Sequence, residues 1–291
     1  MSRWRNVRKI DAHVHIVLHQ RENTDLMLNP PEAMLRAMDA QNVERAVVLP
    51  INHPGYFPLG EGERADWLRA SNDVQADLMR GSHGRFSAFA DCRIDGPYAE
   101  APAAAAEARR AIDDLGLRGL KIHPYNLDVE ATDPRLAPWV EAAEEKGVPT
   151  VFHANPSGHA SSFHGSAPSR VYAAMRGRSG TFVVAHLGGV AFLETLAGGG
   201  YVDVSGTLLW LAELYGVPFC ERFLRQIGVG RILFATDYPI YSHEAYYEIL
   251  DAMDLSDNEV ERIAFANAER MLHGLAPIDP DREAASDPPI V

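Results

Sequence analysis

The chain has 291 residues, of which 46% are hydrophobic and 23% charged, a composition typical of a globular protein with a substantial buried core. Its formal net charge of -13 argues against a nucleic acid or an anionic membrane as a partner, because both require a concentrated positive surface. The two cysteines, Cys92 and Cys220, do not suggest a disulfide framework or a cysteine-rich zinc site, and no apolar run is long enough to span a membrane; a cytoplasmic location is expected.

Eight short apolar runs, most of them rich in β-branched or aromatic residues, predict eight buried parallel strands. In chain order they cover residues 9–15, 45–50, 85–91, 117–123, 149–153, 181–186, 201–205 and 231–237. A stretch of helical composition follows most of them. Strands that alternate with helices imply parallel pairing and right-handed crossovers.

Several of the expected helices end in glycine directly before the next strand, as helix C-caps do. The predicted helices cover residues 31–41, 63–80, 98–115, 134–146, 169–178, 191–196, 218–228, 243–253 and 257–272. The sixth strand is followed by few residues, so its helix is expected to be short. The pattern predicts an α/β fold, a parallel eight-stranded (β/α)8 barrel of the TIM type over residues 1–275, followed by a tail of residues 276–291 rich in Pro, Asp and Ala.

Polar side chains stand at the C-terminal ends of the predicted strands, the edge at which barrel enzymes build their active sites. His13 and His15 are two residues apart on the first strand and therefore share a face. The fifth strand ends in His153, the sixth in His186 and the eighth in Asp237. Imidazoles and a carboxylate that converge at the mouth of a barrel suit one divalent ion such as Zn²⁺, with Mn²⁺ as the other candidate.

With these residues the chain resembles the amidohydrolase superfamily, in particular the branch of aminocarboxymuconate-semialdehyde decarboxylase and its hydrolase relatives. The resemblance runs through the motifs DAHVH, GLKIHP, VFHAN, VVAHLGG, ILFATDYP and FANAERML, which span most of the chain. It implies that His13, His15, His153 and Asp237 are metal ligands, with His186 beside the metal as a catalytic group.

Other residues near the strand ends are candidates for contact with a substrate. Lys121 and His123 share a face of the fourth strand; Lys121 is expected to be a buried charge or a substrate contact, and His123 to bind substrate or a second metal. Asn52, Asn155 and Tyr238 follow the second, fifth and eighth strands, and their positions make them candidates for substrate binding.

The ligand pattern fits two reactions. A metal-activated water could hydrolyse a small ester, lactone or amide, with Asp237 accepting the water proton and His186 polarising the carbonyl group. The alternative is non-oxidative decarboxylation of an unsaturated or aromatic carboxylic acid. The sequence favours hydrolysis, because no arginine directly follows strands one, five, six or eight to bind a carboxylate.

A third function, of another class, is a non-catalytic barrel that binds a small molecule; the complete set of ligand residues argues against it. The expected partners are a small-molecule substrate and, as a further candidate, a second copy of the chain. Trp210 and Tyr215, which follow the seventh strand, could form a homodimer interface or cap the site.

Overall fold

The computed structural model describes residues 2–19, 27–51, 66–156 and 164–278. Each of the eight predicted strands is present in this part of the chain, most of them shorter than the apolar run that predicted it. The strands are β1 (Lys9–Val14), β2 (Val43–Val48), β3 (Phe86–Ala88), β4 (Leu120–Ile122), β5 (Thr150–Phe152), β6 (Phe182–Val184), β7 (Tyr201–Asp203) and β8 (Ile232–Leu233).

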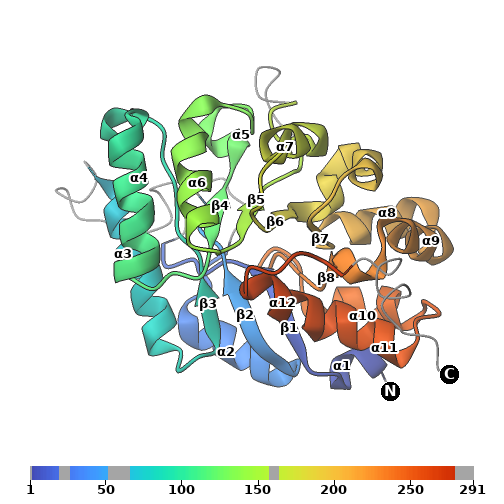
Figure 1. Ribbon diagram of the computed structural model, residues 1–291. Coiled ribbons are helices and arrows are strands. Elements are labelled where there is room, and N and C mark those ends of the chain that lie inside the picture. The colour runs from blue at the N-terminus through green and yellow to red at the C-terminus, as the bar shows by residue number, and fades with distance from the viewer. Residues whose placement is uncertain (1, 20–26, 52–65, 157–163, 279–291) are drawn as a thin grey trace, which may run out of the picture.

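The strands close into a barrel. Parallel ladders order them β1-β2-β3 and β4-β5-β6-β7-β8. Ala90, just after β3, pairs with Leu120 and joins the two sets on one side. On the other side Val14 pairs with Tyr238, and the amide of His15 donates to the carbonyl oxygen of Tyr238 at 2.8 Å. The predicted (β/α)8 barrel is therefore confirmed (Figure 1).

Helices surround the strands (Figure 1). The α-helices are α1 (Arg3–Asn6), α2 (Pro31–Ala40), α3 (Trp67–Gly81), α4 (Ala101–Arg109), α5 (Pro124–Leu127), α6 (Ala137–Glu145), α7 (Pro168–Met175), α8 (Thr207–Tyr215), α9 (Val217–Ile227), α10 (His243–Asp251), α11 (Asp257–Glu261) and α12 (Asn267–Leu272). Shorter or irregular helical turns are η2 (Gly96–Ala99), η3 (Arg110–Asp114), η4 (Pro134–Leu136), η5 (Ala185–Ala197), η6 (Val229–Arg231) and η7 (Arg262–Ala266).

The helix predictions need three corrections. Between the seventh strand and the predicted helix 218–228 lies α8, a helix that is absent from the prediction; its sequence TLLWLAELY is too uniformly apolar to show a helical periodicity. The short helices α1 and α5 are also absent from the prediction. The expected helix over residues 191–196 is instead part of the irregular 3-10 segment η5, which opens with left-handed residues. The first residues of the predicted helix 63–80 lie outside the described residues.

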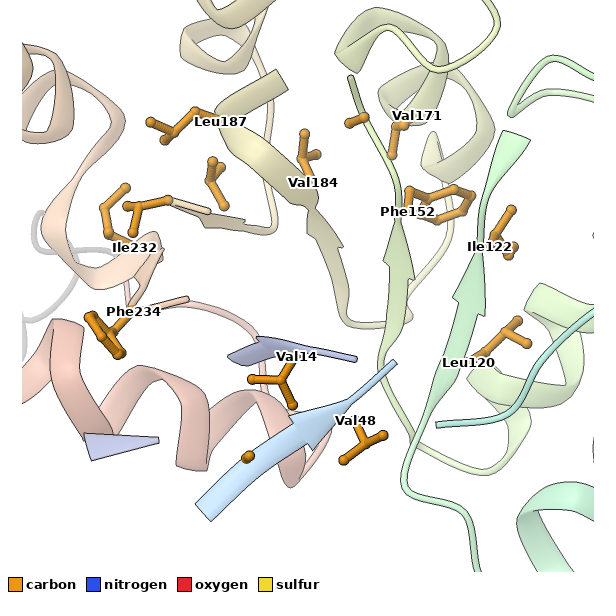
Figure 2. Packing of buried hydrophobic residues seen from close by; sticks show 14 of the residues in the cluster. Val14, Val48, Leu120, Ile122, Phe152, Val171, Val184, Leu187, Ile232 and Phe234 are labelled. Atoms are coloured by element: carbon orange, nitrogen blue, oxygen red, sulfur yellow. The ribbon is translucent and has the colours of Figure 1, made fainter. Parts of the chain in front are cut away.

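Successive strand residues alternate between two apolar clusters, as the pleat requires. On β5, Val151 belongs to the cluster inside the barrel, and Phe152 belongs to the larger cluster between the strands and the outer helices. Figure 2 shows Phe152 and Ile122 of this larger cluster, with Val171 of α7 beside them. The same alternation points His153, which follows Phe152, toward the barrel interior.

Gly119, which precedes β4, supplies a test of how tightly the interior is packed. A Cβ atom there would lie 2.3 Å from Cε2 of Phe89, a fully buried ring of the interior cluster. We expect Gly119→Ala to lower the free energy of unfolding by about 1–3 kcal/mol, measured by denaturant titration, because an overpacked core must shift. Gly81→Ala is the matched control, since nothing lies within 4 Å of the position that its Cβ atom would take. Equal stability of the two variants would contradict the prediction.

The C-terminal boundary of the barrel is only partly visible. The predicted tail over residues 276–291 has residues 276–278 in the described part of the chain, so the division at residue 275 stays a prediction. Within the described ranges, no helix is both long and apolar enough to cross a membrane.

Candidate metal centre and active site

Five buried side chains meet where the strands end. His13 lies in β1 and His15 directly follows it, His186 lies two residues after β6, Asp203 ends β7 and Asp237 follows β8. His13 and His15 point the same way, as their spacing predicts, and their ring centroids are 5.1 Å apart. Ligand atoms of His13, His15 and Asp237 all lie within 4.8 Å of one another, close enough to hold one metal ion.

The hydrogen bonds of His13 and His15 fix which ring nitrogen carries the proton. Nδ1 of His15 lies 2.8 Å from the carbonyl oxygen of Leu49, and Nδ1 of His13 lies 2.9 Å from Oδ2 of Asp203. Both partners can only accept, because one is a carbonyl oxygen and the other a carboxylate, so each Nδ1 is the donor. In the neutral rings, Nε2 then carries a lone pair. Burial, followed by the charge of Lys121, lowers the pKa of His13 to about 3, which keeps this ring neutral at pH 7.

Both lone pairs face the same carboxylate oxygen. Nε2 of His15 lies 3.0 Å and Nε2 of His13 lies 3.6 Å from Oδ1 of Asp237. This oxygen is buried and has no hydrogen-bond partner among the described residues. Three electron pairs directed at one another are repulsive unless a cation lies between them. The arrangement therefore fits a divalent ion with nitrogen and oxygen ligands, in which a hydrogen bond from each Nδ1 orients the ligand ring.

Asp237 is held in place by its main chain. Its amide donates to the carbonyl oxygen of His13 at 2.9 Å, and its φ of 61° lies in the left-handed region that few residues other than glycine adopt. Burial alone would raise the pKa of the Asp237 carboxyl group. A hydrogen bond from His15, followed by positive charge on His13 and His186, would outweigh that effect and lower the pKa; where these rings are neutral, a bound cation would supply the same stabilisation of the carboxylate.

His153 lies outside the group formed by the ligand atoms of His13, His15 and Asp237. Its Nδ1 is 3.0 Å from Nε2 of His186, and its ring stacks on that of His123 with 3.7 Å between centroids. Its nitrogens are not part of the group of ligand atoms within 4.8 Å. Three of the four predicted ligands thus surround one point, and the role of His153 as the fourth ligand stays a prediction.

A cavity of about 410 Å³ opens beside these residues. Its polar lining includes His153, His186, Asp237 and the predicted substrate residue Asn155. Its apolar lining comes from Val190 in η5, Trp210 in α8, and Ile240 and Tyr241 after β8. Among the described residues that line it, none is lysine or arginine.

The remaining predicted substrate residues lie in different surroundings. Lys121 is fully buried, and burial lowers its pKa to about 8 although Asp203 and Asp237 act in the opposite direction. His123 caps α5, where its Nδ1 accepts a hydrogen bond from the amide of Asn126 at 3.3 Å.

Tyr238 packs against His243, with 5.4 Å between ring centroids, and does not line the cavity described above. Asn52 lies outside the described residues.

Asp203 and Ser205 are functional candidates that the sequence prediction missed. Asp203 accepts from His13, and Ser205 Oγ lies 2.8 Å from Nδ1 of His186. Both belong to the YVDVSG segment at the end of the predicted seventh strand. The rule that singled out the polar ends of strands one, five, six and eight would also have found Asp203.

Comparisons with known proteins identify the family of the chain. The amidohydrolase family model matches residues 10–274. Gamma-resorcylate decarboxylase of Rhodococcus jostii (strain RHA1) is 26% identical over 299 residues, which cover 83% of this chain and 87% of that protein.

Solved structures support the same fold. The 2,6-dihydroxybenzoate decarboxylase from Rhizobium superposes with a TM-score of 0.68 at 19% identity, covering 91% of this chain and 98% of the other. The 5-carboxyvanillate decarboxylase from Novosphingobium aromaticivorans DSM 12444, complexed with manganese, gives 0.67 at 16% identity and covers 92% and 96%. The family match extends over nearly the whole barrel, and the chain is therefore an enzyme that belongs to the amidohydrolase family.

Proposed function

We propose that the chain is a metal-dependent decarboxylase of an aromatic carboxylic acid. The observation that carries metal dependence is the buried Oδ1 of Asp237, which faces the Nε2 lone pairs of His13 and His15. The reaction is supported by the relatives, whose names give gamma-resorcylate, 2,6-dihydroxybenzoate and 5-carboxyvanillate as the acids that they decarboxylate. The sequence favours hydrolysis, but these relatives favour its alternative.

His13, His15 and Asp237 would hold the ion, with His153 as the predicted fourth ligand. Nitrogen and oxygen donors of this kind accept either Zn²⁺ or Mn²⁺. The manganese in the 5-carboxyvanillate decarboxylase favours Mn²⁺ over the Zn²⁺ that was expected first. When bound, the ion supplies positive charge that orients an anionic substrate. The described residues that line the cavity include no lysine or arginine that could supply this charge.

The apolar lining of the cavity suits an aromatic ring. Trp210, Ile240 and Tyr241 contribute apolar surface to the same cavity that His153 and Asn155 line. Aromatic pairs gain about 0.5–1.5 kcal/mol beyond the area that they bury. A flat ring packed on these side chains would have its carboxylate within the same cavity as the proposed metal centre at Asp237.

Asp237 is the residue best placed to move a proton. It is ionised at rest, so it would first accept a proton from a hydroxyl group of the substrate and then deliver it from Oδ2 to the ring carbon that bears the carboxylate. The carbon–carbon bond would break next, its electron pair would restore the aromatic ring, and carbon dioxide would leave. The product would regain its hydroxyl proton from water. Both nitrogens of His186 already have partners in Ser205 and His153, so His186 would position the neighbouring groups.

The proposal is tested by incubating the protein, loaded with Mn²⁺, with 2,6-dihydroxybenzoate and with 5-carboxyvanillate. We expect release of carbon dioxide and appearance of the decarboxylated phenol by chromatography, and none with metal-free protein. A parallel panel of small esters, lactones and amides tests hydrolysis. Hydrolysis without carbon dioxide release would restore the first expectation from the sequence, and binding of either acid without turnover would support the non-catalytic barrel.

A further inference from the structure

Asp203 forms hydrogen bonds to both His13 and His186, which belong to different sequence motifs. It ends β7 and is fully buried. Its Oδ2 accepts the Nδ1 proton of His13 at 2.9 Å. Its Oδ1 accepts the main-chain amide protons of His186 at 2.9 Å and of Ser205 at 3.1 Å. The hydroxyl of Ser205 also donates to Oδ1.

The proton of Ser205 decides the tautomer of His186. The main-chain amides of His186 and Ser205 both donate to Oδ1 of Asp203, so this oxygen is an acceptor and the Ser205 hydroxyl that also contacts it is the donor. The single hydroxyl proton of Ser205 therefore points to Asp203. Its oxygen is then left to accept from Nδ1 of His186, 2.8 Å away.

The same reasoning extends to His153. Because Nδ1 of His186 carries the proton, Nε2 of the neutral ring carries a lone pair. That lone pair faces Nδ1 of His153 at 3.0 Å, so His153 is the donor and keeps its own Nε2 lone pair. One carboxylate thus orders three imidazoles: His13 directly, His186 through Ser205, and His153 through His186.

The main chain at this point also depends on Asp203. His186 and Leu187 have φ values of 57° and 49°, in the left-handed region that is unfavourable for these residue types. The hydrogen bond from the amide of His186 to Asp203 stabilises this turn, while Ser205 holds the ring.

We infer that Asp203 is a positioning residue which, directly and through Ser205, sets the ring tautomers of His13 and His186 so that the metal ligands present Nε2 to the ion. The inference rests on the proposed metal centre, but it concerns hydrogen bonds that exist without substrate. Hydrogen-bond partners behind metal-bound histidines usually change metal affinity by about 10–100-fold when they are removed.

The first test reads the tautomers directly. Long-range ¹H–¹⁵N spectra of metal-free protein labelled at histidine distinguish a proton on Nδ1 from one on Nε2; signals of the two rings are assigned with His13→Gln and His186→Gln. We expect Nδ1–H for both rings in the wild type. Of these two rings, Ser205→Ala should change the tautomer of His186 and leave that of His13 as it is, Ser205→Thr should restore it, and Asp203→Asn should change both.

The second test measures the affinity for Mn²⁺ by competition with a chelator. We expect Asp203→Asn to weaken binding by about 10–100-fold and Ser205→Ala to weaken it less, because His13 and His15 keep their partners. Asp11→Asn is the matched control: this fully buried carboxylate reaches His13 only through the main-chain amide, at 3.2 Å. It should keep the wild-type tautomers and weaken binding less than Asp203→Asn.

Unchanged tautomers and affinity in folded Asp203→Asn would overturn the inference. If that variant does not fold, Ser205→Ala and Ser205→Thr decide it, since an unchanged His186 tautomer in Ser205→Ala has the same meaning. Neither readout needs turnover. Absence of decarboxylation together with the expected tautomer changes would refute the proposed reaction and leave the role of Asp203 intact.

Discussion

Asp237→Asn is expected to lower the rate of decarboxylation by about a thousandfold or more, the upper range for loss of a general acid–base group. The amide cannot carry the transferred proton. The substitution also removes the negative charge of Asp237, whose Oδ1 lies 3.6 Å from Nε2 of His13 and 3.0 Å from Nε2 of His15. The variant should therefore bind Mn²⁺ more weakly as well, because a charged ligand becomes neutral.

Turnover measured at saturating Mn²⁺ separates these two effects, since added ion restores occupancy but not proton transfer. Asp77→Asn is the control: its side chain is 73% exposed on α3 and pairs with Arg80. It should keep wild-type turnover and metal content. Near-normal turnover of Asp237→Asn at saturating Mn²⁺ would remove Asp237 from proton transfer and leave it only as a ligand.

The barrel could be predicted because the information lies in short segments. Each parallel strand is buried on both faces, so an apolar run such as TFVVAH marks it without reference to the rest of the chain. Segment η5 could not be predicted in the same way. Its path depends on left-handed residues at His186 and Leu187. This turn is stabilised by a hydrogen bond from the His186 amide to Asp203, which belongs to the next strand, 17 residues later.

In the site, too, one part could be predicted from the sequence and another could not. The strand ends place His13, His15 and Asp237 together, and position in the barrel is enough to predict this. The direction of each ring is set by partners that spacing does not reveal, such as the carbonyl oxygen of Leu49 behind His15. Sequence spacing also does not reveal that the ring of His153 contacts the ring of His186.

The expectation of hydrolysis depended on the absence of arginine after four of the strands. That argument treats the carboxylate anchor as a side chain. In a cavity whose described lining has no lysine or arginine, a divalent ion can itself supply the positive charge. The absence of arginine therefore does not separate the two reactions, and the relatives decide which one to test first.

Removal of the ion is expected to lower the melting temperature by about 5–10 °C. An ion present at a hundredfold excess over its dissociation constant stabilises the folded state by about 2.7 kcal/mol, and each kcal/mol shifts the melting temperature of a chain of this size by about 2–4 °C. The physical cause is local. Without a cation, the lone pairs of His13 and His15 and the buried Oδ1 of Asp237 repel one another in the folded protein only.

Elemental analysis and thermal unfolding of the same samples test this prediction, with and without chelator and after Mn²⁺ is added back. We expect one ion per chain and a melting temperature that falls and recovers with it. His15→Ala should lose both the ion and the response to chelator, because only two of the clustered ligands remain. Two ions per chain would bring His123 into the site through its Nε2, since its Nδ1 already accepts from the amide of Asn126. A protein that holds no ion, takes none up and melts at the same temperature with chelator would show that the electron pairs around Asp237 are separated by a proton, and the metal centre would have to be abandoned.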